Sequence, residues 1–320
     1  VTVLEGIQAS VGKDTRVYYS EGCHLFKPMT TGLAEPRDRF AEALAVAERS
    51  DVVVMCLGLD ETIEGEEGDT GNEYGSGDKM HLNLPGLQQE LLEAVFATGK
   101  PVIVVLLSGS ALAVTWADKH VSAIIQAWYP GGRGGEAIAS LLFGEYSPSG
   151  RLPVTFYATT EELPDFRDYS MEGRTYKYMT EEALYPFGYG LSYTKFEYSD
   201  IKVAESFKAG DSVSCSATVT NIGNNASEET VQLYLRDVQT SASMAPRWQL
   251  RGIRKVYLKP GEKAEVNFTL TPKQLSLIDD DGNEVLEPGT FNIFIGGSQP
   301  DSRSISLTGT QVQKAFFEIA

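Results

Sequence analysis

One stretch of the chain concentrates side chains that can donate and accept protons. Five acidic residues fall within nine positions, at Glu61, Glu64, Glu66, Glu67 and Asp69. Carboxylates this close repel one another when ionised, which predicts a raised pKa for some of them. A carboxylic acid that stays protonated near neutral pH can protonate a departing glycosidic oxygen. A solvated acidic loop and a calcium site fit the same residues, although the spacing is not that of an EF-hand.

The acidic cluster follows a short apolar run, DVVVMCLG, over residues 51–58. Such a run is typical of a strand that is buried on both faces of a sheet. Residues 59–83 then form one long segment without a helix or strand pattern. Loops beyond ~12–15 residues are uncommon in compact domains unless they are functional, and functional groups gather in loops beyond the carboxyl ends of parallel strands. The loop is therefore the main candidate for a site.

The elements around this loop alternate along the first two hundred residues. Helical spacing is found at 35–50, 84–100, 111–120 and 134–144, and strand-like runs are found at 16–20, 51–58, 101–108 and 122–128. This alternation predicts an α/β sandwich, a mostly parallel sheet with helices on both faces.

The pattern changes near residue 195, where short segments of period two alternate with turns such as NIGNN and KPGEK. Repeated short strands over this length predict an all-β sandwich of immunoglobulin or fibronectin III type. Residues 180–199 are rich in Tyr, Phe, Gly and Pro, which is unlike a flexible linker. We therefore predict an α/β sandwich domain over 1–179, an ordered aromatic strap over 180–199 and a β-sandwich over 200–320.

The composition narrows the choice of partners. The net charge of −17 opposes binding to nucleic acid and to an anionic membrane, and no run approaches the ~20 apolar residues of a membrane span. The three cysteines, Cys23, Cys56 and Cys215, form no CxxC pair, so we interpret them as free buried thiols. No metal or organic cofactor is implied. The sequence does not indicate a cellular location.

Two further groups of residues invite functional interpretations that we do not favour. Ser108 and Ser110 flank Gly109 after a strand, but SGS is not the GxSxG elbow of serine hydrolases. Trp128 and Tyr129 could stack on a sugar ring, yet an aromatic residue at the end of a buried strand more often belongs to the core.

Three long motifs resemble one family. Residues 123–156, AIIQAWYPGGRGGEAIASLLFGEYSPSGRLPVTF, and residues 171–199 resemble the carboxyl-terminal α/β domain of glycoside hydrolase family 3. Residues 219–270, which include VTNIGNNASEETVQLYLRD, resemble the fibronectin type III-like domain that follows it in many members. The resemblance implies a retaining, exo-acting β-glycosidase, with a β-glucosidase favoured over a β-xylosidase, acting on a β-linked oligosaccharide or glycoside.

The resemblance also implies roles for single residues. A loop of the α/β domain often supplies the acid/base glutamate in this family. An ungapped match of GLDETIEGEEGD to the family pattern places it at Glu66, and counting back from GDK places it at Glu67, with Glu64 third. Glu64, Asp78 and Lys79 are implied as substrate-binding residues. Lys79 stands where the family usually has arginine, which weakens any bidentate contact there.

In the family the nucleophile is an aspartate on a TIM-like barrel, and no barrel or convincing nucleophile motif is found in this sequence. The opening VTVLEGIQAS has neither a starting Met nor the basic-then-apolar pattern of a signal peptide. We therefore expect a carboxyl-terminal portion whose partner is a barrel on the same precursor or on a separate chain. Retaining hydrolysis needs two carboxyl groups about 5 Å apart, so we expect the chain alone to be inactive. A non-catalytic carbohydrate-binding or structural module is the alternative, although such a module has no need of the acidic loop.

Overall fold

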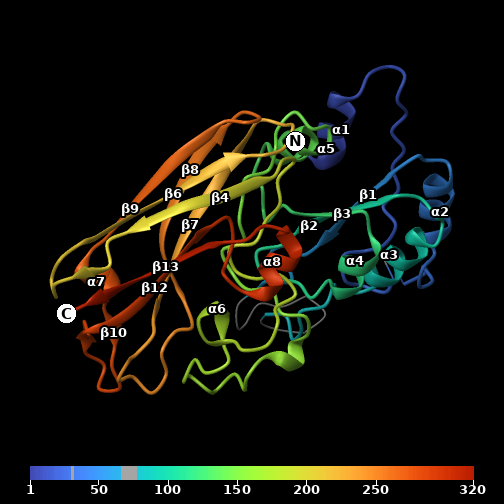
Figure 1. Cartoon of the computed structure of the whole chain (residues 1–320). Helices are drawn as coiled ribbons and strands as arrows, with labels where there is room; N and C mark the ends of the chain where they lie inside the picture. The colour runs from blue at the N-terminus through green and yellow to red at the C-terminus, as the bar shows by residue number, and fades with distance from the viewer. Residues whose placement is uncertain (30–31, 66–77) are drawn as a thin grey trace. The chain divides into compact units, whose positions relative to one another are not determined.

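The computed structural model describes residues 1–29, 32–65 and 78–320. The chain divides into two compact units, which Figure 1 shows together. Unit 1 comprises Val1–Glu145 and Tyr157–Glu162, and unit 2 comprises Tyr146–Phe156 and Leu163–Ala320. The short segment 146–156 thus leaves unit 1, joins unit 2 and returns.

Unit 1 is a parallel sheet with helices on both sides. Strands β1 (Val53–Gly58), β2 (Val102–Leu107) and β3 (Ala123–Gln126) pair in the order β1-β2-β3, all parallel. Helices α1 (Val3–Ser10) and α5 (Gly134–Leu142) lie on one side of the sheet in Figure 1. Helices α2 (Phe40–Glu48), α3 (Gln88–Phe96) and α4 (Thr115–His120) lie on the other, and a 3₁₀ turn spans Thr160–Glu162. The predicted α/β class is confirmed.

The strand predicted at 16–20 is wrong, because this segment forms no ladder. Tyr18 and Tyr19 are 43% and 64% exposed, so their side chains do not enter the sheet core. All three cysteines are free. Their prediction as buried thiols is right for Cys215 alone, because Cys23 is half-buried and Cys56 is exposed.

Close backbone packing joins the start of the chain to α5. Thr2 caps α1 through a capping box with Glu5, which satisfies two of the free amides at the helix start. A Cβ atom on Gly6 would lie 2.1 Å from the Gly135 carbonyl oxygen, and one on Gly135 would lie 1.9 Å from the Thr2 carbonyl oxygen. Only glycine permits this approach of α1 to α5 at both positions.

Unit 2 is a β-sandwich. Its larger sheet has the order β5 (Ser206–Phe207), β13 (Gln313–Ile319), β12 (Gly289–Gly296), β7 (Ser227–Asp237) and β8 (Gln249–Leu258). The smaller sheet has the order β4 (Phe196–Val203), β6 (Val213–Asn221) and β9 (Lys263–Leu270). A short pair, β10 (Leu277–Ile278) and β11 (Glu284–Val285), and helices α6 (Thr175–Tyr178), α7 (Pro272–Leu275) and α8 (Ser302–Thr308) complete the unit.

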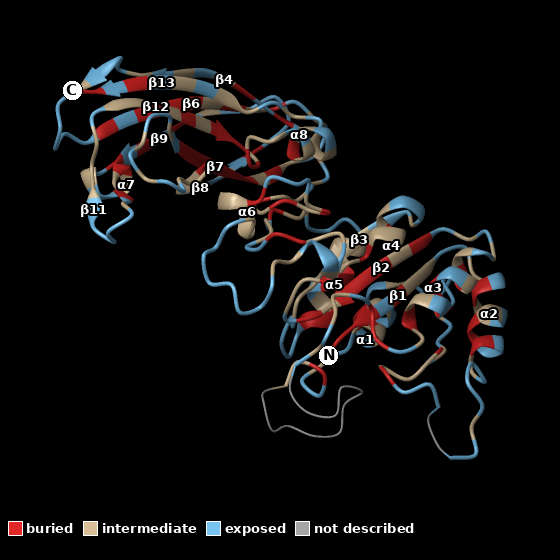
Figure 2. Cartoon of the chain, turned by 90° about the horizontal axis from the view of Figure 1, so that it is seen from below, coloured by how far each residue is buried: buried red, intermediate tan, exposed pale blue. Residues whose placement is uncertain are grey.

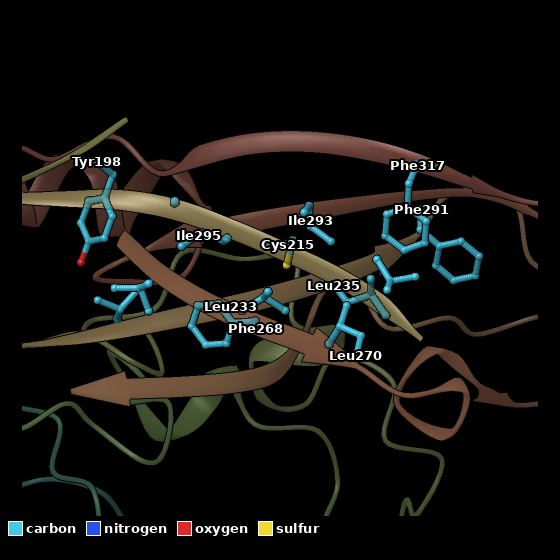
Figure 3. Close-up of a cluster of buried hydrophobic side chains, with 14 of the residues drawn as sticks. Tyr198, Cys215, Leu233, Leu235, Phe268, Leu270, Phe291, Ile293, Ile295 and Phe317 are labelled. Carbon is cyan, nitrogen blue, oxygen red and sulfur yellow. The ribbon is translucent and has the colours of Figure 1, made fainter. Parts of the chain in front are cut away.

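The sandwich core forms because alternate residues of each strand point inward. In β9, for example, every second residue is buried or half-buried and its neighbours are exposed. Figure 3 shows the inward side chains of both sheets facing one another, including Phe268 and Leu270 from β9 and Phe291 and Ile293 from β12. Figure 2 shows the resulting alternation of buried and exposed residues along the strands. The predicted fibronectin-like sandwich is confirmed.

A buried ion pair crosses the interior of unit 2. Arg151, on the segment 146–156, contacts Glu229 of β7 at 2.8 Å, and their side chains are 9% and 3% exposed. The hydroxyl of Tyr198 on β4 donates to the other oxygen of Glu229 at 2.6 Å, and Arg151 Nε donates to the Gly297 carbonyl at 3.2 Å. Four separate segments therefore meet around this ion pair.

Residues of the aromatic segment 180–199 pair with residues of 150–156. Phe156 and Tyr185 form an antiparallel bridge, the Gly188 amide donates to the Leu152 carbonyl at 2.7 Å, and the Leu152 amide donates to Tyr189 at 2.9 Å. Both segments lie in unit 2.

Candidate active site

The candidate site is built where the three parallel strands of unit 1 end. Because β1, β2 and β3 run in the same direction, the loops that follow them leave the sheet at one edge. The loop after β1 begins at Leu59, whose amide donates to the Leu107 carbonyl at 2.7 Å. Ile63 is completely buried, so the first residues of this loop are anchored in the core.

Gln88 fixes the point where β1 becomes the loop. Its side-chain oxygen accepts from the Gly58 amide at 2.7 Å, and its nitrogen donates to the carbonyls of Gly58 and Leu25, each at 2.8 Å. Gly58 has a φ of +135°, and a Cβ there would lie 2.0 Å from the Leu107 carbonyl oxygen. The strand end therefore requires glycine, and the buried amide of Gln88 satisfies its polar groups.

Glu64 joins the loops that follow all three strands. The Gly109 amide, after β2, donates to Oε2 at 2.7 Å, and the Ser110 hydroxyl donates to Oε1. The hydroxyl of Tyr129, after β3, also donates to Oε2. A Cβ on Gly109 would lie 2.8 Å from Oε2 and 2.9 Å from the Tyr129 ring, so a larger residue would separate these groups. One carboxylate thus ties the edge of the sheet together.

Burial raises the pKa of Glu64, but hydrogen bonds from Ser110, Tyr129 and Gly109 and the charge of Lys79 outweigh it, so the pKa is lowered. Burial and the negative charge of Glu64 raise the pKa of Tyr129, which keeps its phenol protonated as a donor. The raised pKa expected for some members of the acidic cluster is therefore not found at Glu64. An ionised carboxylate that accepts three hydrogen bonds is suited to holding loops and is poorly suited to protonating a leaving group.

Lys79 also reaches this edge of the sheet. Its Nζ donates to the Ala111 carbonyl at 2.9 Å, in the loop that contains Gly109 and Ser110. Burial lowers the pKa of Lys79, while the charges of Glu64 and Asp78 oppose that shift. Asp78 Oδ1 accepts from the Lys79 amide at 2.7 Å. Of the predicted substrate-binding residues, the structure therefore brings Glu64 and Lys79 to the same edge of the sheet, and Asp78 precedes Lys79 in the chain.

Glu66 and Glu67, the predicted acid/base pair, lie outside the described residues. The site includes residues that sequence reasoning set aside, namely Gly109, Ser110 and Tyr129. One signal was available for them, because all three lie within two residues of the end of a predicted strand. A second signal is structural: Trp128, next to Tyr129, has a φ of +53°, which is rare for a bulky residue and is often found at functional sites.

Over the described ranges, no three His, Cys, Asp or Glu side chains come close enough to hold a metal ion. Of the helices in the same residues, none is both long enough and apolar enough to cross a membrane.

Two family models match the chain. Residues 1–193 match the glycosyl hydrolase family 3 C-terminal domain, and residues 229–299 match the fibronectin type III-like domain.

Curated relatives and solved structures agree with these matches. A xylan 1,4-β-xylosidase of Xylanibacter ruminicola is 42% identical over 273 residues, covering 85% of this chain and 31% of the relative. A periplasmic β-glucosidase of Salmonella typhimurium is 35% identical, covering 92% of this chain and 41% of the relative. A β-glucosidase structure from Erythrobacter marinus superposes with a TM-score of 0.82 at 34% identity, covering 100% of this chain and 43% of that one. The chain thus spans between about a third and two fifths of the length of these relatives.

Proposed function

The chain belongs to glycoside hydrolase family 3, and we propose that it serves as the carboxyl-terminal portion of a retaining, exo-acting β-glycosidase. Its substrate is a β-glucoside or a β-xyloside. The loop after β1 supplies the acid/base glutamate, Glu66 or Glu67, to a site that a TIM-like barrel completes with its nucleophile. The barrel belongs to the same precursor or to a separate chain.

The observation that carries this proposal is the fixed start of the acidic loop. Ile63 is buried and Glu64 is bound to Gly109, Ser110 and Tyr129, so the residue before Gly65 is held at the carboxyl edge of the sheet. A loop that starts from a rigid point can present an acid two or three residues later within a narrow range of positions, and catalysis depends on such positioning. A simple binding module has no need of this arrangement.

Glu64 serves in this proposal as a positioning residue, because its carboxylate is already ionised and hydrogen-bonded. Asp78 and Lys79 bind substrate or shape the pocket that receives it. Lys79 is held by the Ala111 carbonyl, so its charge lies at the same edge of the sheet as Glu64.

The test joins this chain to the amino-terminal part of the Xylanibacter ruminicola relative, in place of the region that it matches. Hydrolysis of nitrophenyl β-glucoside and β-xyloside is measured for this chimera and for the chain alone. We expect turnover by the chimera and none by the chain alone, because one carboxyl group cannot perform retaining hydrolysis.

Glu66→Gln and Glu67→Gln variants of the chimera then identify the acid. Loss of general acid catalysis costs about 10²–10⁴-fold in rate. The loss must be larger for a methyl glycoside than for a nitrophenyl glycoside, because nitrophenolate leaves without protonation. Added azide must restore turnover, because it replaces the water that the general base activates. Glu64→Gln is the matched control. It should lower kcat through misplacement of the loop, but without azide rescue and with an equal effect on both leaving groups.

Activity in both glutamine variants would refute the assignment of the acid to this pair. An active chain without any barrel would refute the proposed need for a partner domain. A correctly folded but inactive chimera, in which the chain still binds sugars, would favour the non-catalytic carbohydrate-binding module instead.

A further inference from the structure

The residue Tyr129 carries an exposed aromatic ring at the carboxyl edge of the unit 1 sheet. It lies in the loop after β3, and 49% of its surface is accessible to solvent. The interpretation of this tyrosine as a core residue is therefore wrong. Its ring lies where the loops after β1, β2 and β3 leave the sheet, and parallel sheets bind their ligands at this edge.

Contacts on two sides fix the position of this ring. Its hydroxyl donates to Glu64 Oε2, which also accepts from the Gly109 amide at 2.7 Å. One edge of the ring lies against Gly109, because a Cβ atom added there would be 2.9 Å from Tyr129 Cε2. The preceding residue, Trp128, has a φ of +53°, a conformation that a bulky residue keeps only where its surroundings impose it. A ring that is held at its hydroxyl and at one edge presents its remaining surface in one orientation.

The charges around the ring favour a neutral ligand. Burial and the negative charges of Glu64 and Asp60 raise the pKa of Tyr129, so its phenol stays neutral and these charges repel an anion. The charge of Lys79, which acts on the same Glu64 carboxylate, opposes a cation. The π face of a neutral aromatic ring attracts C–H groups, so the flat face of a sugar ring suits it.

We propose that the leaving group of the substrate stacks on the exposed ring of Tyr129, which thereby favours a sugar leaving group over a small alcohol. Glu66 and Glu67, one of which is the proposed acid, follow Glu64 by two and three residues. The acid protonates the oxygen between the sugar and its leaving group, so the leaving group lies beside the acid. Tyr129 is bound to Glu64, at the start of that same loop. The assignment to the leaving group rests on the proposed function, whereas the exposed, fixed ring does not.

The first test follows the ring signals of ¹³C-labelled tyrosine in the whole chain by NMR during titration with cellobiose and xylobiose. The chain has 15 tyrosines, and a Tyr129→Phe variant identifies the signals of Tyr129. We expect a saturable shift of these signals with at least one disaccharide. Tyr19 is the internal control, because it belongs to the same unit and is 64% exposed, so a non-specific effect of sugar would shift it as much. No barrel is needed, so a negative result here is distinct from failure of the catalytic proposal.

The second test compares leaving groups in the chimera. It measures kcat/KM for a disaccharide, cellobiose or xylobiose, and for the methyl glycoside of the same sugar. Tyr129→Leu removes the ring and should lower kcat/KM for the disaccharide about tenfold more than for the methyl glycoside, because only the disaccharide loses an aromatic contact. A purely structural role of Tyr129 would lower both values by the same factor.

Tyr129→Phe separates the role of the ring from that of the hydroxyl. This variant keeps the ring but loses the hydrogen bond to Glu64, which positions the loop. It should therefore lower kcat for both substrates by the same factor and leave the ratio of their kcat/KM values as in the parent. Tyr19→Leu is the matched control for the loss of an exposed tyrosine and should also leave this ratio unchanged.

Two results would overturn the proposal. The first is a Tyr129 signal that shifts no more than that of Tyr19 up to about 50 mM disaccharide. The second is an active chimera in which Tyr129→Leu lowers kcat/KM equally for the disaccharide and the methyl glycoside, which would mean that Tyr129 only holds Glu64. If the parent chimera is inactive, the proposed function fails, and the NMR titration alone decides whether the ring binds a sugar.

Discussion

Replacing Arg151 with methionine should strongly destabilise the sandwich of unit 2. Methionine fills a similar space but leaves the carboxylate of Glu229 buried without its cation. The side chains of the pair are 9% and 3% exposed, so solvent cannot replace the lost charge. Breaking a buried ion pair by removing one partner costs about 3–5 kcal/mol. The Tyr198 hydroxyl still donates to Glu229, so we expect a value near the lower limit, about 3 kcal/mol.

The thiol of Cys215 provides the assay. It lies in the sandwich core, it is 4% exposed, and burial raises its pKa to about 12. In a Cys23→Ser, Cys56→Ser background, it should react with a thiol reagent only when the sandwich opens. Since 1.4 kcal/mol corresponds to a factor of ten, a loss of about 3 kcal/mol should speed labelling by roughly 10²-fold. The rate must be proportional to reagent concentration, which shows that closing is faster than labelling.

Two controls separate this explanation from a general effect of mutation. Lys202→Met removes a partner of Glu265, but that pair is 67% and 49% exposed and should change labelling by only a few-fold. Arg151→Met combined with Glu229→Met removes both buried charges and should restore much of the protection. A single variant that labels less than about five times faster than the parent would refute the reasoning. So would a double variant that labels as fast as the single one.

Three other outcomes are expected. Gln88→Leu should lower the free energy of unfolding of unit 1 by about 3 kcal/mol in urea, because it leaves the polar groups of Gly58 and the Leu25 carbonyl without a partner. Gln89→Leu, at the neighbouring half-buried position, should cost far less. Gly58→Ala should destabilise unit 1 at least as much as Gln88→Leu, because its Cβ would clash with the Leu107 carbonyl. The melting temperatures of the two variants make the comparison, and an unchanged value for Gly58→Ala would contradict the described backbone. The pKa of Glu64 is below its ordinary 4.5, so its hydrogen bonds should stabilise the loops at and above that pH and be lost as pH falls through the lowered pKa. NMR titration of the Gly109 amide should report that loss, and a Glu64→Gln variant should abolish the titration.

Local sequence pattern was sufficient for the architecture. The runs at 51–58 and 101–108 are apolar over the length of a strand, and β1 and β2 form within them because only a sheet covered on both faces buries such a run. The same holds for unit 2, where strict alternation along 263–270 places Val266, Phe268 and Leu270 in the core. The prediction of a strand at 16–20 was wrong, because a short aromatic run forms a strand only if a neighbouring strand pairs with it.

The loop after β1 could be recognised as a site from its length and its acidic residues, and the family resemblance pointed to Glu66 and Glu67. What only the tertiary structure decided was the role of Glu64. It is 45 residues from Gly109 and 65 residues from Tyr129 in sequence, and the three meet because parallel pairing of β1, β2 and β3 brings the loops after them to one edge. A carboxylate among other carboxylates in sequence is thereby surrounded by donors in space, which lowers its pKa instead of raising it.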